Sequence, residues 1–325
     1  MAEPLLEVAE LSVDYLTDAG DVRAVDRVSF TLEAGEFLGI VGESGCGKST
    51  LLFGVGQLLS PPGAVAGGTV SFRGHDMVRL SAEELRHMRW RDYSVVMQSA
   101  MNALNPMKSI GSQFKDTLQA HGSPSSEEIR QRSAEVLSLV GIDSAHLSSF
   151  PHQLSGGMRQ RAMIAMALLF TPQLVMMDEP TSALDVVAQR SMMTKIKELQ
   201  RRLGFAVIFV THDMSVVSRY SDRVLVMYAG QIAEAARTEA IFDRPLHPYT
   251  RGLMNAYPSV TGPRKDLLGI AGSPPDLARP PSGCRFHPRC PHAMPVCLSR
   301  RPELYPVDDA EVRCLLYTEQ GKEAV

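Results

Sequence analysis

The chain has 325 residues, its 33 Lys and Arg nearly balance its 36 Asp and Glu, and 44% of its residues are hydrophobic. A formal net charge of -3 gives no reason to expect a general affinity for nucleic acid, and the composition is typical of a globular protein. The N-terminal segment is acidic where a secretory signal needs a basic flank, and no apolar run approaches the roughly 20 residues that span a bilayer. We therefore expect the chain to stay in the cytosol, where disulfides are rare.

The first part of the chain predicts mainly strands. Alternating or apolar residues predict them over 5–15, 27–32, 37–42 and 67–74. The predicted strand over 37–42 is apolar and runs into a glycine-rich turn, and we expect a helix directly after that turn. Another helix is predicted over 81–90, because its Ser-x-x-Glu start resembles a capping box.

The rest of the core alternates helices with strands. From about residue 98 to 165 the pattern is helical with longer loops, which predicts an inserted helical subdomain. Apolar strands follow over 173–180, 205–213 and 223–230. This alternation predicts a largely parallel sheet covered on both faces. Because the composition shifts to proline near residue 260, we expect one domain over 1–260 and an extension over 261–325.

A glycine-rich loop follows the third predicted strand. The segment GESGCGKST (42–50) fits the pattern G-x-x-x-x-G-K-S/T between a strand and a helix, where backbone amides cradle phosphates. In this pattern Lys48 neutralises the β and γ phosphates and the Ser49 hydroxyl holds Mg²⁺. The residues expected to bind nucleotide here are Gly42, Ser44, Gly45, Cys46, Gly47, Lys48, Ser49 and Thr50.

Two carboxylates stand at the end of a later strand. The apolar run LVMM is followed by Asp178 and Glu179. One can hold Mg²⁺ through water while the other polarises an attacking water. Alone, such a pair is more often a solvated turn, but the phosphate loop upstream favours the catalytic interpretation.

The segment LSGGMRQR (154–161) reads as a helix start. Ser155 would cap the helix, and Gly156 and Gly157 would leave its free amides open to an anion. On these residues alone it is a generic helix start. Between the phosphate loop and the Asp-Glu pair, however, it resembles the signature motif of ATP-binding-cassette (ABC) ATPases.

Further residues follow the order of that family. Gln98 in VVMQSA resembles the Q-loop glutamine, Asp185 at the end of SALD resembles the D-loop aspartate, and His212 in FVTHD resembles the switch histidine. Tyr15 stands where the family usually has an aromatic that stacks on adenine, although an aromatic in a strand is usually a core residue.

The resemblance continues to the C-terminus. FDRPLHPYTRGLMNA (242–256) and the cysteine-bearing segment beyond it resemble the C-terminal region of ATPase subunits of bacterial oligopeptide and dipeptide importers. One departure is SAMNALNP after Gln98, where the family is closer to DPMTSLNP. The resemblance implies an α/β ABC-type P-loop ATPase domain over 1–260, with the helical subdomain inserted at about 98–165 and the small extension over 261–325.

The resemblance also implies an arrangement of active sites. Two ATPase subunits close head to tail, and each site combines the phosphate loop of one chain with the signature motif of the other. Glu179 would be the general base, and His212 would contact the γ phosphate. Ser49 and Gln98 would hold Mg²⁺, with Asp178 acting through water. The residues Ser155 and Gly157 would serve the partner's nucleotide.

The implied function is ATP-driven uptake of dipeptides and oligopeptides at the cytoplasmic face of the bacterial plasma membrane. The implied partners are a second ATPase subunit forming a heterodimer, two integral permease subunits and an extracytoplasmic solute-binding protein, with no nucleic acid. Import of oligosaccharides or metal is an alternative. A soluble ABC protein acting on nucleic acid or ribosomes is a further one, which the single cassette with a compact insert disfavours.

Four of the five cysteines lie in the extension. These are Cys284, Cys290, Cys297 and Cys314. Disulfides are disfavoured in the cytosol, and coincidental structural thiols remain an alternative. Four thiolates suit zinc or an iron-sulfur cluster, but the gaps of five, six and sixteen residues are wider than those of typical zinc pairs. The family resemblance favours a structural [4Fe-4S] cluster on these four cysteines.

Overall fold

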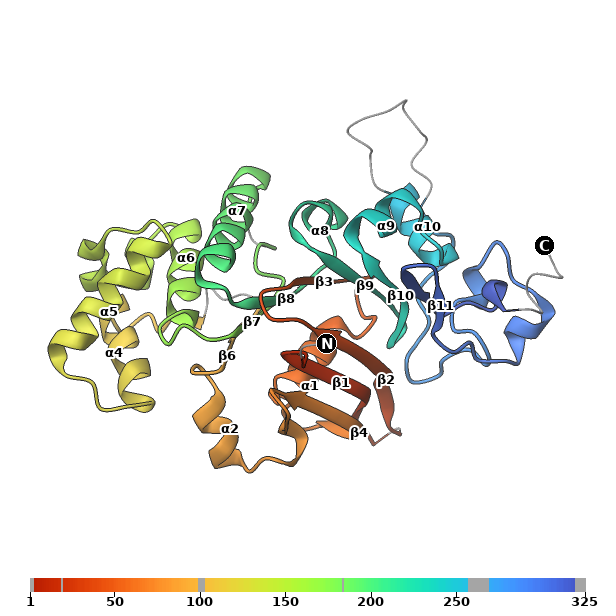
Figure 1. Ribbon diagram of the computed structural model, residues 1–325, viewed down its shortest axis with the longest axis horizontal. Helices are drawn as coiled ribbons and strands as arrows, with labels where there is room; N and C mark the ends of the chain where they lie inside the picture. Colours follow the sequence, from red (N-terminus) through yellow and green to blue (C-terminus); the bar gives the residue numbers. More distant parts are fainter. Residues whose placement is uncertain (1–2, 19, 99–102, 183, 257–268, 319–325) are drawn as a thin grey trace. The chain divides into compact units, whose positions relative to one another are not determined.

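The computed structural model describes residues 3–18, 20–98, 103–182, 184–256 and 269–318 (Figure 1). These residues form two compact units. The first comprises Met1–Thr31, Leu38–Val78 and Thr211–Val325, and the second comprises Leu32–Phe37 and Arg79–Val210, within the described ranges. The predicted boundary between residues 260 and 261 lies outside the described residues, as do positions 99–102 of the SAMNALNP departure.

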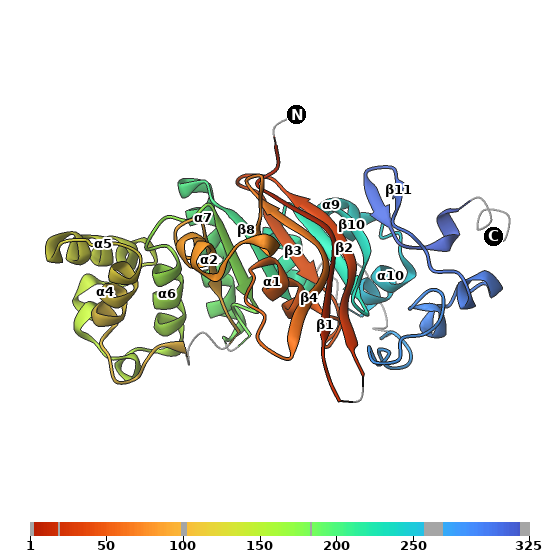
Figure 2. The same ribbon diagram turned by 90° about the horizontal axis from the view of Figure 1, so that it is seen from below.

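The first unit contains an antiparallel sheet with strand order β2-β1-β4-β5. Its strands are β1 (Leu6–Tyr15), β2 (Val22–Leu32), β4 (Gly63–Phe72) and β5 (His75–Asp76). Strand β4 runs antiparallel to β1, and Figure 2 shows β1, β2 and β4 side by side. The alternating patterns predicted strands here without giving their direction, and the structure places them in a sheet of their own, apart from the largely parallel one.

The first unit also carries strands in the order β11-β12-β10-β9-β3. Their bounds are β3 (Phe37–Val41), β9 (Arg223–Tyr228), β10 (Gln231–Arg237), β11 (Tyr305–Val307) and β12 (Ala310–Val312). Strands β3 and β9 are parallel, whereas β10 is antiparallel to both β9 and β12. The cysteine-bearing segment therefore adds two strands, β12 and β11, to the edge of this sheet at β10.

The helices of the first unit flank these strands (Figure 1). They are α1 (Lys48–Val55), α8 (Met214–Tyr220), α9 (Thr238–Asp243) and α10 (Pro248–Asn255). Helix α1 follows β3 directly, as predicted, and contacts β1 and β4. The end of β3 and the start of α1 therefore fix the two ends of the glycine-rich loop.

The second unit contains parallel strands in the order β8-β7-β6. They are β6 (Tyr93–Val96), β7 (Leu174–Asp178) and β8 (Ala206–Thr211), and every residue of β7 and β8 is buried. Continuous burial is typical of parallel strands, and it explains why apolar runs predicted β7 and β8. The four-residue strand β6 was not predicted.

The helices of the second unit include the group that the sequence predicts as an inserted subdomain. Their bounds are α2 (Ala82–Met88), α4 (Ile110–Ala120), α5 (Ser126–Leu139), α6 (Gly156–Ala167) and α7 (Val186–Leu203). Helix α5 contacts both α4 and α6. The capping box predicted at Ser81 is confirmed, because its hydroxyl accepts from the Glu84 N–H. Within the described residues, no helix combines the length and apolar character needed to cross a membrane.

Candidate active site

The glycine-rich loop joins β3 to α1, and two of its glycines cannot be replaced without a clash. A Cβ on Gly42 would lie 2.2 Å from the Met227 carbonyl oxygen. A Cβ on Gly47, whose φ is +102°, would lie 2.3 Å from the Ala24 carbonyl oxygen. The backbone therefore packs closely against neighbouring strands while its amides turn into the first turn of α1.

Lys48 places its charge inside this loop. Its Nζ donates to the carbonyl oxygens of Gly42 (2.8 Å) and Glu43 (2.9 Å). The side chain is only 6% exposed, so the ammonium group is held by the loop itself. Beside it, burial raises the pKa of Cys46, which keeps that thiol neutral. The loop thus presents one fixed positive charge among backbone amides, which suits a phosphate group.

The structure brings Tyr15 to the end of the same loop. Its hydroxyl lies 3.2 Å from Thr50 Oγ1, and the side chain is half-buried. His212 belongs to the same unit and is exposed directly after β8. The predicted residues Tyr15, Lys48, Ser49 and His212 therefore all lie in the first unit.

The carboxylates and Gln98 lie in the second unit. Asp178 ends β7 and is 2% exposed, whereas Glu179 is partly exposed. Gln98 Nε2 donates to Glu179 Oε2 over 3.2 Å, so the structure brings these two predicted residues together. Glu179 also has a positive φ of 43°, a conformation that costs about 1–3 kcal/mol in a non-glycine residue. Its N–H donates to Val210 O (2.9 Å), which helps to hold it there.

The signature segment begins α6 as predicted. Ser155 is its N-cap and its hydroxyl accepts from the Met158 N–H over 3.3 Å. Ser155 is exposed, and a Cβ on Gly157 would meet nothing within 4 Å. The start of this helix is therefore open to a ligand or partner in the described structure.

Gln160 is a residue of this segment that sequence reasoning missed. It is 5% exposed, and its Nε2 donates to Pro180 O over 2.6 Å. This bond ties the signature helix to the loop that follows Glu179. A glutamine on the buried side of a predicted helix was the available signal, since buried amides need partners.

Asp185, which the sequence predicts to be the D-loop aspartate, also caps a helix. It is the N-cap of α7, and its Oδ1 accepts from the Ala188 N–H over 2.9 Å. The next two residues, Val186 and Val187, are 80% and 79% exposed. Asp185 is thus followed by an exposed apolar surface at the start of a helix.

The four cysteines of the extension gather in one neighbourhood of the first unit. The Cys284 N–H donates to Cys297 O (2.8 Å), and all but the half-buried Cys290 are buried. Burial, together with the charges of the neighbouring cysteines, raises the pKa of Cys284 to about 11 and that of Cys314 to about 12. Within the described part of the chain, no three His, Cys, Asp or Glu side chains are placed as ligands of a single metal ion.

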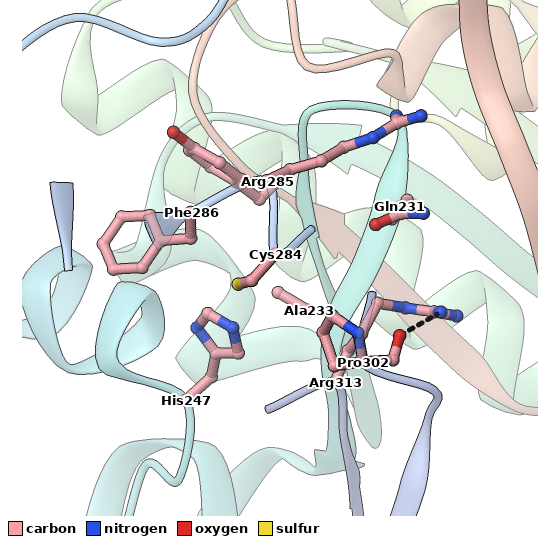
Figure 3. Close-up of a pocket in the computed structure, with 9 residues that line it drawn as sticks. Gln231, Ala233, His247, Cys284, Arg285, Phe286, Pro302 and Arg313 are labelled. Carbon is pink, nitrogen blue, oxygen red and sulfur yellow. Dashed lines mark hydrogen bonds between the residues drawn. The ribbon is translucent and has the colours of Figure 1, made fainter. Parts of the chain in front are cut away.

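A small cavity of about 20 Å³ lies beside Cys284 (Figure 3). Its lining consists of Tyr228, Gln231, Ala233, His247, Cys284, Arg285, Phe286, Pro302 and Arg313. Burial lowers the pKa of His247 to about 3, so the imidazole is neutral. The cavity has room for about one water, whereas ligand pockets measure roughly 300–1,000 Å³. It is therefore part of the packing of the extension and not a nucleotide site.

The extension also contacts the phosphate loop, which the sequence analysis did not predict. Arg289 Nη1 and Nη2 donate to the two carboxylate oxygens of Glu43 over 2.7 and 2.9 Å. The Glu43 N–H donates to the Tyr249 hydroxyl over 2.9 Å. Glu43 stands at a variable position of the loop pattern, and 246 residues separate it from Arg289, so no local pattern joins them.

Comparison with known proteins identifies relatives along nearly the whole chain. A family model described as ABC transporter matches residues 25–182, and one described as Oligopeptide/dipeptide transporter, C-terminal region, matches residues 233–297. The dipeptide transport ATP-binding protein DppD of Caldanaerobacter subterraneus subsp. tengcongensis is 42% identical over 97% of this chain and 98% of its own length. The oligopeptide transport ATP-binding protein OppD of Salmonella typhimurium is 45% identical over 93% and 90%, respectively.

Solved structures agree with these matches. A dimeric structure of the bacterial ABC transporter cassette MJ0796 has a TM-score of 0.64 and 29% identity, covering 72% of this chain and 98% of its own. The cbiO1 structure from Clostridium perfringens has the same TM-score with 27% identity. The predicted ABC-type α/β fold and the predicted family are thereby confirmed. The chain is an ATPase of the ABC transporter family, and it belongs to the group of transport ATP-binding proteins that carry the oligopeptide/dipeptide transporter C-terminal region.

Proposed function

We propose that this chain is the ATP-hydrolysing subunit of a bacterial importer of dipeptides and oligopeptides, bound peripherally at the cytoplasmic face of the plasma membrane. The observation that carries the proposal is the match of residues 233–297 to the oligopeptide/dipeptide transporter region, in a chain whose relatives DppD and OppD match along almost its full length. Its partners would be two permease subunits and an extracytoplasmic solute-binding protein.

Each predicted site residue takes a role within this proposal. The amides of residues 42–50 and the Lys48 ammonium bind the β and γ phosphates, and Tyr15 stacks on adenine. Ser49 and Gln98 would hold Mg²⁺, with Asp178 acting through water, and the bound ion would supply positive charge beside the phosphates. Glu179 accepts the proton of the attacking water, and His212 contacts the γ phosphate. The hydrogen bond between Gln98 and Glu179 supports a shared role for these two side chains.

The proposal makes each chain half of two active sites. Ser155, Gly156, Gly157 and Asp185 would act on the nucleotide of a second ABC ATPase, which we take to be a different subunit. The exposed Ser155 and the open surroundings of Gly157 support such a role. The exposed Val186 and Val187 beside Asp185 provide apolar surface that a partner would cover.

Peptide-stimulated ATP hydrolysis tests the proposed function. When the chain is reconstituted in liposomes with its partner ATPase and permease subunits, peptide-loaded binding protein on the other side should stimulate hydrolysis severalfold. The Lys48→Ala variant should lose this stimulation, because the phosphates lose their neutralising charge. If a binding protein loaded with oligosaccharide or metal stimulates ATP hydrolysis and a peptide-loaded one does not, the solute is an oligosaccharide or a metal and not a peptide.

We also infer that Cys284, Cys290, Cys297 and Cys314 hold a [4Fe-4S] cluster of structural function. Three of the four thiols are buried and Cys290 is half-buried. Their side chains are not placed around a single ion within the described residues, so the inference rests on four cysteines close together, the residue type that ligates such clusters.

Protein purified without oxygen should therefore be brown, absorb broadly near about 400 nm and contain roughly four irons per chain. Iron should be lost when both Cys290 and Cys297 are changed to serine. The Cys46→Ser variant is the matched control, because that thiol lies in the phosphate loop, and it should keep its iron. Stoichiometric zinc without iron, or iron retained in the double variant, would contradict the cluster.

A further inference from the structure

Glu43 is fixed within the phosphate loop at three points. Its N–H donates to the Tyr249 hydroxyl (2.9 Å), and its carbonyl oxygen accepts from Lys48 Nζ (2.9 Å). Its two carboxylate oxygens accept hydrogen bonds from Nη1 and Nη2 of Arg289, at 2.7 and 2.9 Å. A change in the position of Glu43 therefore moves a carbonyl oxygen that holds the Lys48 ammonium.

The Arg289 side chain is itself rigidly placed. It is 5% exposed, and its Nε donates to Ala271 O over 2.9 Å. Its guanidinium also lies 5.8 Å from the ring centre of Tyr228. The hydrogen bonds to Glu43 raise the pKa of Arg289, so its charge is permanent. Exposed ion pairs contribute little to stability, whereas a bidentate pair shielded from water, such as Arg289 and Glu43, holds its two side chains in a defined geometry.

A second arginine of the extension supports the other end of the loop. Arg285 Nη2 donates to Asp26 Oδ2 over 2.6 Å, and the two side chains are 6% and 4% exposed. Asp26 follows the strand segment whose Ala24 carbonyl oxygen closely approaches Gly47. Removing one partner from a buried ion pair leaves the other charge buried and uncompensated, which is strongly destabilising. Both Glu43 and the backbone against Gly47 are therefore held by arginines that flank the predicted cluster cysteines.

We propose that Arg289 is a positioning residue for nucleotide binding. By fixing Glu43 it fixes the pocket of carbonyl oxygens that holds Lys48, so the affinity of the loop for MgATP depends on the C-terminal extension. The inference rests on the proposed phosphate-binding role of this loop. Because coupling free energies are reciprocal, bound nucleotide stabilises the segment around Arg289 to the same extent.

Nucleotide affinity in the full-length chain provides the test. The Kd for MgATP is measured by calorimetry for wild type, Arg289→Gln, Glu43→Gln and the double variant. We expect both single variants to bind roughly tenfold more weakly, within the usual range of coupling between sites. The double variant should bind no more weakly than either single one, because both changes break the same link.

The two single variants separate positioning from a direct effect of charge. Glu43→Gln removes a negative charge near the phosphates, so electrostatics alone would tighten MgATP binding, whereas lost positioning weakens it. Tighter binding by Glu43→Gln together with weaker binding by Arg289→Gln would therefore overturn the inference. Should Arg289→Gln not fold, Arg289→Lys carries the same test, because lysine keeps the charge but cannot form the bidentate pair.

The matched control is Asp308→Ala. Asp308 of the extension pairs with Arg244 at the end of α9 in an exposed ion pair away from the loop, so its removal should leave the Kd unchanged. In the assembled transporter, Arg289→Gln should raise KM for ATP with little change in kcat. A lower melting temperature with an unchanged Kd and KM would reduce Arg289 to a merely structural role. Failure of the wild-type chain to bind MgATP would instead contradict the proposed function.

Discussion

Glu179→Gln is expected to bind MgATP with nearly normal affinity but to hydrolyse it at least about a hundredfold more slowly in the assembled transporter, the usual contribution of a general base. The substituted amide keeps the size of the side chain and can still hydrogen-bond to Gln98, so the local geometry is retained. What it loses is the capacity to take a proton from the attacking water. The closed ATPase dimer should therefore accumulate with ATP bound.

Steady-state phosphate release and size-exclusion chromatography with MgATP measure the two consequences of Glu179→Gln. Glu198→Gln is the control, because Glu198 lies on the exposed side of α7 and pairs only weakly with Lys195 at 3.4 Å. It should hydrolyse ATP at the wild-type rate. A Glu179→Gln variant with near-normal turnover would remove Glu179 from the role of general base.

Ser155→Arg is expected to damage the active site on the partner's phosphate loop while sparing nucleotide binding at the chain's own Lys48. The arginine removes the N-cap of α6, at a cost of about 1 kcal/mol, and fills the open space at the helix start. Because that space would receive the partner's nucleotide, the loss should be largest in the other chain. ATP hydrolysis by the pair should fall accordingly.

Photo-crosslinked nucleotide can be counted separately in the two subunits. Ser125→Arg is the matched control, because it removes the N-cap of α5 in the same unit without touching a motif. It should leave crosslinking in both subunits unchanged. Equal loss of nucleotide at both phosphate loops in Ser155→Arg would argue against shared sites.

Local patterns predicted much of this molecule. The apolar runs of β3, β7 and β8 identified strands because these strands are buried along their whole length, and β9 is buried except at Arg223. The caps at Ser81 and Ser155 were also predicted, since a cap depends only on residues three positions away. The phosphate loop could be predicted because its glycine spacing reflects close backbone packing.

The rest depends on contacts that no local pattern contains. Strand β12 has three residues, too few to show a periodicity, yet it pairs with β10 at Glu234 and Ala235. The side-chain amide of Gln160 donates its hydrogen bond to a carbonyl oxygen twenty residues away. The contact between Glu43 and Arg289 joins a variable loop position to a basic residue in a proline-rich segment. Such partners are defined by the fold alone.

The long separation of Glu43 from Arg289 also orders events during synthesis. A ribosome adds about 5–20 residues per second, so Arg289, 246 positions after Glu43, is added roughly 12–50 s later. Throughout that interval the nascent chain carries a phosphate loop without its support. If Arg289 positions the loop as proposed, a chain that has not yet reached residue 289 would bind MgATP roughly tenfold more weakly. Fragments that end between His212 and Arg289 would carry every predicted motif of the ATPase without that support.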